Sequence, residues 1–163
     1  MTFKVAIAQI NPRLGDLQSN LALYEEKIHR GVKEKADLLL FPELSLTGYF
    51  LRDMVPNVAL KLSAPEIKEL KKLSREVSFV AGLVEESSDY RFYNAAVYFE
   101  DGEIRHVHRK VYLPTYGMFD EQRYFARGDR VRAFDSKFGR IAVLICEDLW
   151  HPSTVYLAAL DGA

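Results

Sequence analysis

Residues 36–41 read ADLLLF, a nearly continuous apolar run that Pro42 ends at once. Such a run is typical of a strand that is covered on both faces of a sheet. Upstream, residues 17–32 carry apolar side chains at spacings of three and four, which predicts an amphipathic helix. Alternating apolar residues at 3–7 predict a strand before that helix. The start of the chain is therefore predicted to run strand, helix, strand.

The middle of the chain favours antiparallel pairing. Residues 79–84, 94–99 and 104–107 each have the composition of a strand. The last two of these segments flank Asp101-Gly102, which is the strongest short hairpin signal in the sequence. An antiparallel hairpin is therefore predicted there.

Two further helices and one further strand are predicted. Residues 63–66 read SAPE, which has capping-box spacing with proline in the first turn, and a helical apolar period continues to Val77. Residues 141–146 read IAVLIC and resemble a buried strand. Pro152 then opens a predicted helix that covers residues 153–160.

These elements together predict one α/β domain over residues 1–163, with a mixed sheet that helices cover on at least one face. The sequence contains no internal repeat, low-complexity tract or linker rich in glycine, serine and proline. At this length a chain can bury a proper core without disulfides or metals.

Composition argues against several classes of protein. Lysine and arginine number 22 against 23 aspartate and glutamate, for a net charge of -1, so a basic footprint for nucleic acid is lacking. No apolar run approaches the length of a membrane span, and the apolar start is too short for a secretory signal. A single cysteine cannot form an internal disulfide. We expect a cytoplasmic protein that binds neither nucleic acid nor membrane.

Three residues that could carry chemistry share one setting. Glu43, Lys110 and Cys146 each lie where an apolar strand gives way to a polar loop, the usual place for ligands in α/β sheets. A thiol is mostly protonated at neutral pH, so a nucleophilic cysteine needs a base or a positive environment. Glu43 offers the base and Lys110 the positive charge. Lys110 and backbone N–H groups after Cys146 could also stabilise an oxyanion.

Each of these residues also has a simpler interpretation. A lone cysteine at the end of a strand is usually a small core side chain, a lone glutamate a loop residue or helix cap, and a lone lysine a surface charge. His106 and His108 could begin a metal site, but no third ligand is fixed by the spacing. Asp120-Glu121 could be a carboxylate pair or part of a loop that covers the sheet edge.

Four segments in order resemble the nitrilase superfamily of carbon-nitrogen hydrolases. They read VAIAQINPRLGDLQSN from Val5, LLLFPELSLTGY around Glu43, HRKVYLPTYGMFDEQRYFARGD around Lys110, and IAVLICEDLW around Cys146. The resemblance covers the whole chain, with the four segments correctly ordered and spaced.

The resemblance implies roles for these residues. Glu43 would be the general base, Lys110 the stabiliser of the tetrahedral intermediate and Cys146 the nucleophile. Glu121 would orient the lysine and the substrate nitrogen. The implied fold is a four-layer α-β-β-α sandwich, and the implied assembly is a homodimer or larger homo-oligomer. Members usually continue well beyond the nucleophile, so residues 1–163 are expected to be the N-terminal part of a longer hydrolase domain.

Within the superfamily, LPTYGMFDEQRYF and CEDLW look most like the glutaminase domain of glutamine-dependent NAD synthetases. That likeness implies that Tyr116 lines a glutamine pocket and that an ammonia-accepting synthetase domain, fused or separate, is a partner. The Glu147 N–H would bind the oxyanion. No metal or organic cofactor is required.

The expected activity is hydrolysis of a small, glutamine-like carboxamide to acid and ammonia through a thioester on Cys146. Two alternatives stay open: a nitrile-hydrolysing member of the same family, and a non-catalytic fragment or interaction module that needs a further C-terminal half.

Overall fold

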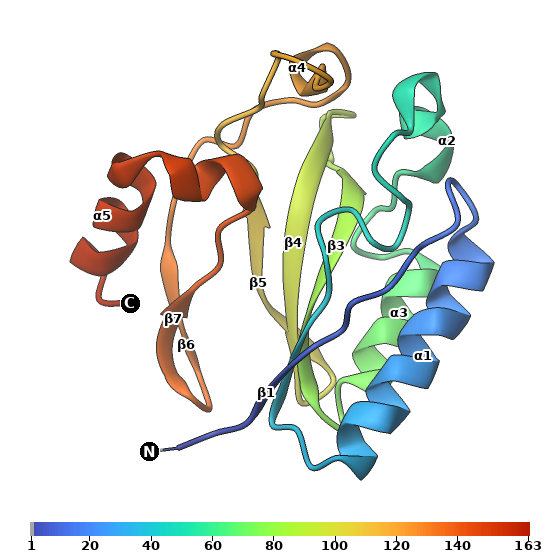
Figure 1. Cartoon of the computed structure of the whole chain (residues 1–163), viewed down its shortest axis with the longest axis vertical. Coiled ribbons are helices and arrows are strands. Elements are labelled where there is room, and N and C mark those ends of the chain that lie inside the picture. Colours follow the sequence, from blue (N-terminus) through green and yellow to red (C-terminus); the bar gives the residue numbers. More distant parts are fainter. Residues whose placement is uncertain (1) are drawn as a thin grey trace.

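The computed structural model describes residues 2–163 and contains a five-stranded sheet and a separate two-stranded hairpin (Figure 1). The elements, in chain order, are β1 (Val5–Ile7), α1 (Leu17–Lys33), β2 (Leu38–Leu40), the 3₁₀ helix η1 (Arg52–Met54), α2 (Val55–Val58), α3 (Pro65–Leu73), β3 (Ser78–Glu86), β4 (Phe92–Glu100), β5 (Glu103–Arg109), α4 (Glu121–Tyr124), β6 (Ala133–Ser136), β7 (Gly139–Ala142), the 3₁₀ helix η2 (Cys146–Trp150) and α5 (Pro152–Leu160).

The large sheet is mixed, as predicted. Its strands lie in sequence order, with β1, β2 and β3 parallel and β3, β4 and β5 antiparallel. The predicted hairpin joins β4 to β5, and its two turn residues, Asp101 and Gly102, have φ angles of 52° and 83°. Two successive residues in the left-handed region match the right-handed twist of the flanking strands. As a result β5 runs parallel to β2, and the carboxyl ends of both strands lie at the same end of the sheet.

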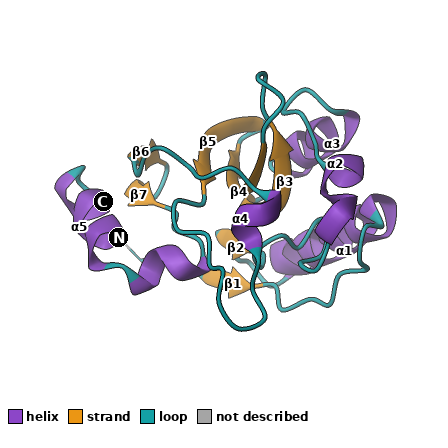
Figure 2. Ribbon diagram, turned by 90° about the horizontal axis from the view of Figure 1, so that it is seen from above, coloured by secondary structure: helices purple, strands orange, loops and turns teal. Residues whose placement is uncertain are grey.

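The two faces of the large sheet are covered differently. Helices α1 and α3 lie on one face, whereas the β6–β7 hairpin and α5 lie on the opposite side (Figures 1 and 2). The core under α1 and α3 contains fully buried Tyr24, Ile28, Ile67 and Phe79. The core on the hairpin side includes Leu38, Val80, Ala96, Tyr98, Phe134 and Ile145.

The predicted capping box at SAPE is wrong. Helix α3 begins at Pro65, and its N-cap is Ala64, in an extended conformation with no side-chain capping bond. Proline disfavours the helical region for the residue before it, so Ala64 rather than Ser63 becomes the last non-helical residue. The helix also ends at Leu73, four residues before Val77, because the chain turns there towards β3.

The strand predicted before Cys146 is shorter and less buried than expected. Strand β7 ends at Ala142, and residues 143–145 reach Cys146 without strand pairing. Of residues 141–145, only Ile145 is fully buried. The reason is that β7 pairs with β6 alone, in a two-stranded sheet.

Within residues 2–163, no helix is both long enough and apolar enough to cross a membrane.

Candidate active site

Glu43, Lys110 and Glu121 come together at the end of the sheet where β2 and β5 finish. Glu43 follows β2, Lys110 directly follows β5, and Glu121 is the first residue of α4. The Lys110 ammonium donates hydrogen bonds to Oε1 of Glu43 at 2.6 Å and to Oε1 of Glu121 at 2.7 Å. The Lys110 residue is 1% exposed, so its charge is neutralised inside the protein by two carboxylates rather than by water.

The charges of this cluster depend on one another. Burial alone would lower the pKa of Lys110, but the charge of Glu43 and hydrogen bonds to Glu121 and Glu43 outweigh it, so the pKa is raised. Burial raises the pKa of Glu121, and hydrogen bonds from Lys110 and Tyr49 oppose that rise. The lysine therefore carries a positive charge at the end of the sheet where β2 and β5 finish.

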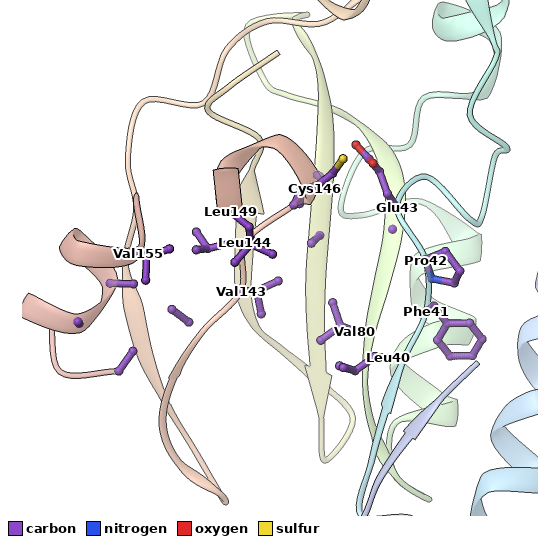
Figure 3. A pocket seen from close by; sticks show the side chains of 18 residues that line it. Leu40, Phe41, Pro42, Glu43, Val80, Val143, Leu144, Cys146, Leu149 and Val155 are labelled. Carbon is purple, nitrogen blue, oxygen red and sulfur yellow. The ribbon is translucent and has the colours of Figure 1, made fainter. Parts of the chain in front are cut away.

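Cys146 begins η2, and its side chain faces the carboxylate of Glu43 (Figure 3). Its φ angle of 43° lies in the left-handed region, which is unusual for a residue with a side chain. Burial and then the negative charge of Glu43 raise the pKa of the thiol, while the charge of Lys110 acts against them. The resting thiol is therefore protonated at neutral pH, and a nucleophile there needs a base.

The turn that carries Glu43 lies directly on β3. A Cβ atom at Gly82 would come within 2.3 Å of the Pro42 carbonyl oxygen and 2.6 Å of the Leu44 nitrogen. Only glycine therefore permits this approach. The Leu46 N–H completes the contact with a 2.9 Å hydrogen bond to the Gly82 carbonyl.

Asp148 connects the turn that carries Cys146 to the segment that follows Lys110. Its Oδ1 accepts the N–H groups of Val111 and Tyr112 at 3.0 and 2.9 Å, and its Oδ2 accepts the N–H of Ile145 at 3.2 Å. Oδ2 also lies 2.7 Å from Nε2 of His108. Burial would raise the pKa of Asp148, but the bonds from His108 and the backbone outweigh it and lower the pKa.

Sequence reasoning did not find Asp148, Tyr49 or Asn94. The Tyr49 hydroxyl donates to Oε1 of Glu121, and the Asn94 amide donates to Oε1 of Glu43 at 2.7 Å. Of these three residues, only Asn94 could have been recognised from the sequence, because it is a lone amide in the apolar strand FYNAAVYF. Tyr49 lies in an irregular loop, and Asp148 lies in a single 3₁₀ turn, where no periodicity predicts burial.

Tyr116 and Glu147 lie beside Cys146 and contact each other. The Tyr116 hydroxyl donates to Oε2 of Glu147 at 2.7 Å, although the tyrosine itself is largely exposed. Oε1 of Glu147 lies 3.5 Å from Nε2 of His151. The pair thus presents polar groups on an open side of Cys146.

Two cavities lie near the cluster. One, of about 550 Å³, adjoins Cys146 and Glu43 and is otherwise lined mainly by apolar side chains from β2, β3 and α5 (Figure 3). The other, of about 660 Å³, adjoins Tyr49 and Glu121 and includes the charged residues Arg52, Asp53 and Arg123.

The histidine pair considered as a metal site is used otherwise. The ring of His106 stacks on Phe134 with centroids 4.3 Å apart, and burial lowers its pKa to about 4. His108 pairs with Asp148. Among the residues that the structure describes, no group of three or more histidine, cysteine, aspartate or glutamate side chains is arranged to hold a metal.

Known proteins resemble this chain in sequence. Residues 4–163 match the family described as carbon-nitrogen hydrolase. The chain is 36% identical over 158 residues to a glutamine-dependent NAD(+) synthetase of Acinetobacter baylyi, and the alignment covers 94% of this chain and 28% of the synthetase.

Solved structures also resemble this chain in fold. The glutamine-dependent NAD+ synthetase from Acinetobacter baumannii matches with a TM-score of 0.80 at 36% identity, over 94% of this chain and 29% of that one. A variant amidase from a Nesterenkonia species, with acrylamide added to its active-site cysteine, matches with a TM-score of 0.87 at 26% identity, over 99% of this chain and 64% of the amidase. The chain thus spans less than a third of these synthetases and less than two thirds of the amidase.

Proposed function

We propose that this chain, which belongs to the carbon-nitrogen hydrolase family of the nitrilase superfamily, carries the catalytic residues of an amidase that cleaves a small carboxamide to acid and ammonia. The observation that carries the proposal is the buried Lys110 ammonium between Glu43 and Glu121, beside the Cys146 thiol. A buried charge is costly, and such a cluster beside a thiol with a raised pKa is typical of a functional site.

Acylation begins when the Glu43 carboxylate takes the proton of Cys146 as sulfur attacks the carbonyl carbon. The carbonyl oxygen becomes an oxyanion. An ammonium group has three N–H donors, and the two carboxylates occupy two of those on Lys110, so the third is free for the oxyanion together with the Glu147 N–H. The C–N bond then breaks, the nitrogen takes the proton from Glu43, and ammonia leaves a thioester on Cys146.

Deacylation uses the same base. Glu43 takes a proton from water as the water oxygen attacks the thioester carbon, and Lys110 again faces the oxyanion. The C–S bond breaks, the acid leaves, and the proton on Glu43 returns to the sulfur. Glu121 acts on the lysine, because its Oε1 accepts both Lys110 and Tyr49 and fixes the direction of the ammonium.

A glutamine-like substrate is the finer part of the proposal. Relatives over nearly the whole of this chain are named glutamine-dependent NAD(+) synthetases. Tyr116 and Glu147 offer a hydroxyl and a carboxylate beside Cys146, which suit the ammonium group of an amino acid. By the same likeness, the ammonia acceptor would be a synthetase domain, fused or separate. We also propose that the complete hydrolase domain folds as a four-layer α-β-β-α sandwich and that the protein is cytoplasmic.

We also propose association with a second copy of the chain. The outer surface of η2 and α5 exposes large apolar side chains, with Trp150 at 78% and Leu160 at 67% exposure. Exposed apolar patches of this kind mark interaction surfaces. Sedimentation velocity should show a homo-oligomer that Trp150→Glu converts to monomer; a monomeric native chain at all concentrations would contradict this part.

The activity is tested by ammonia release from a panel of glutamine, short aliphatic amides and the matching nitriles. We expect release from amides and its loss, by at least about a thousandfold, in Cys146→Ala. Undiminished turnover in that variant would refute the mechanism. Release from nitriles alone would replace the amidase with a nitrilase, and inactivity towards the whole panel would favour a non-catalytic module.

A further inference from the structure

Asn94 lies in β4 and is 1% exposed. Its Nδ2 donates a 2.7 Å hydrogen bond to Oε1 of Glu43, the same oxygen that accepts the Lys110 ammonium at 2.6 Å. The Asn94 carbonyl oxygen of the main chain accepts the Lys110 N–H at 2.9 Å. One residue therefore contacts both the proposed base, through its side chain, and the proposed oxyanion binder, through its backbone.

The orientation of this amide is fixed by the charge of Glu43. Oδ1 of Asn94 is buried and has no hydrogen-bond partner among the described residues, which is costly for a polar atom. Turning the amide over would place Oδ1 against a carboxylate oxygen, and two acceptors repel each other. The orphaned oxygen is thus the consequence of aiming the donor at Glu43.

We infer that Asn94 is a positioning residue for the general base: together with Lys110 it occupies Oε1 of Glu43 and leaves Oε2 as the oxygen that exchanges protons with Cys146 and water. Neither hydrogen bond to Glu43 uses Oε2, and the carboxylate faces the sulfur of Cys146. A carboxylate fixed on one oxygen cannot rotate to present the wrong lone pair, so both proton transfers start from one geometry. This inference rests on the proposed amidase activity.

The first test compares Asn94→Leu with the native chain, using the amide that the native chain hydrolyses fastest. Leucine has the same branched shape and number of side-chain heavy atoms but no donor. We expect kcat to fall by about 10- to 100-fold, a part of the 10²- to 10⁴-fold that a positioned base supplies, with KM changed less than about threefold. A residue that only shaped the substrate pocket would change KM instead.

Tyr98→Phe is the matched control. Tyr98 lies on the same strand and face, and its buried hydroxyl likewise donates to a carboxylate, Oε2 of Glu100, at 2.9 Å. Both variants should lower Tm, because each loses a buried hydrogen bond. Only Asn94→Leu should lose kcat, whereas Tyr98→Phe should keep it within about twofold.

A pH profile separates positioning from folding in a second variant, Asn94→Asp. The charged groups that face this position are Glu43, from the loop after β2, and Lys110, at the end of β5. A protonated carboxyl group can still donate to Glu43, but an ionised one repels it and attracts the ammonium. The kcat of Asn94→Asp relative to the native chain should therefore fall as pH rises from about 5 to 8.

The outcomes are distinguishable. If the native chain is active, three results would overturn the positioning role alone. Two concern Asn94→Leu: a kcat within threefold of the native value, or an effect confined to KM. The third is a kcat of Asn94→Asp, relative to the native chain, that does not change with pH. A native chain that hydrolyses none of the amides overturns the proposed activity and this inference with it.

Discussion

The turn that carries Glu43 and the turn that carries Cys146 face each other at the end of the sheet where β2 and β5 finish, and the protein fixes them differently. Each contains a residue in the left-handed region, Leu44 with φ of 48° in the first and Cys146 with φ of 43° in the second. The Glu43 turn is part of the core: Leu44 and the next three residues are fully buried, and the turn lies against Gly82. The Cys146 turn is at the surface.

The Cys146 turn is anchored chiefly by a single buried side chain. Asp148 accepts hydrogen bonds from Val111, Tyr112 and Ile145, while Leu149 and Trp150 on the same turn are exposed. Glu43, the proposed base, is therefore positioned by the same packing that folds the sheet, whereas Cys146, the proposed nucleophile, is positioned chiefly by one carboxylate. Substitutions on the two sides should differ accordingly in their effects on stability and activity.

The largest effect is expected on the base side, for Lys110→Met. Removal of the ammonium leaves Glu43 and Glu121 as neighbouring, partly or fully buried carboxylates without their counter-ion. We expect a loss of about 3–5 kcal/mol in the free energy of unfolding, measured by urea denaturation. Lys61→Met is the control, because the half-exposed ion pair of Lys61 with Glu86 should contribute less than about 1 kcal/mol. Equal losses in both variants would contradict a core position for the base.

A smaller effect, with its own pH dependence, is expected on the nucleophile side for Asp148→Asn. The amide cannot accept all the hydrogen bonds of the carboxylate, so the free energy of unfolding at pH 6 should fall by about 1–3 kcal/mol. The folded-state pKa of Asp148 lies below its unfolded value of 3.8, so its contribution is full above that value and is lost as pH falls through the folded pKa.

Native and Asp148→Asn stabilities should therefore converge as pH falls from neutral to below 3.8. Asp135→Asn, at an exposed position, is the control and should track the native chain. A constant difference across that range would show that the ionised carboxylate of Asp148 does not anchor the turn.

The smallest effect concerns the contact between the two turns. Because burial and the charge of Glu43 raise the pKa of Cys146, alkylation by iodoacetamide should have its midpoint above that of N-acetylcysteine in the same buffers. Glu43→Gln removes the negative charge and should lower the midpoint. An unchanged midpoint in that variant would mean that Glu43 and the thiol do not interact.

The sequence predicts the proposed catalytic residues better than the side chains that hold them in place. Glu43 follows an apolar run and Lys110 follows a strand-like segment paired through the hairpin at Asp101, so both strand ends can be recognised in the sequence. The contact of Asn94 with Glu43 depends on side-chain geometry across strands, which no local pattern encodes. Asp148 is buried because its turn folds back on the segment after Lys110, a tertiary contact of 36 to 37 residues' separation.

The family membership explains the order of the motifs, and the geometry explains why these residue types are needed there. A protonated thiol requires a base, and a lysine that already donates to two carboxylates keeps one donor for the reaction. The central claim is therefore that Cys146 carries the acyl group, with Glu43 as its base.

Acid quench during turnover of a preferred amide, followed by peptide mass mapping, tests that claim most directly. The account predicts that the acyl group of the substrate is bound as a thioester to the peptide that contains Cys146. The adduct should be absent from Glu43→Gln, which cannot deprotonate the thiol during attack. An acyl adduct on any other residue, or full accumulation in Glu43→Gln, would contradict it.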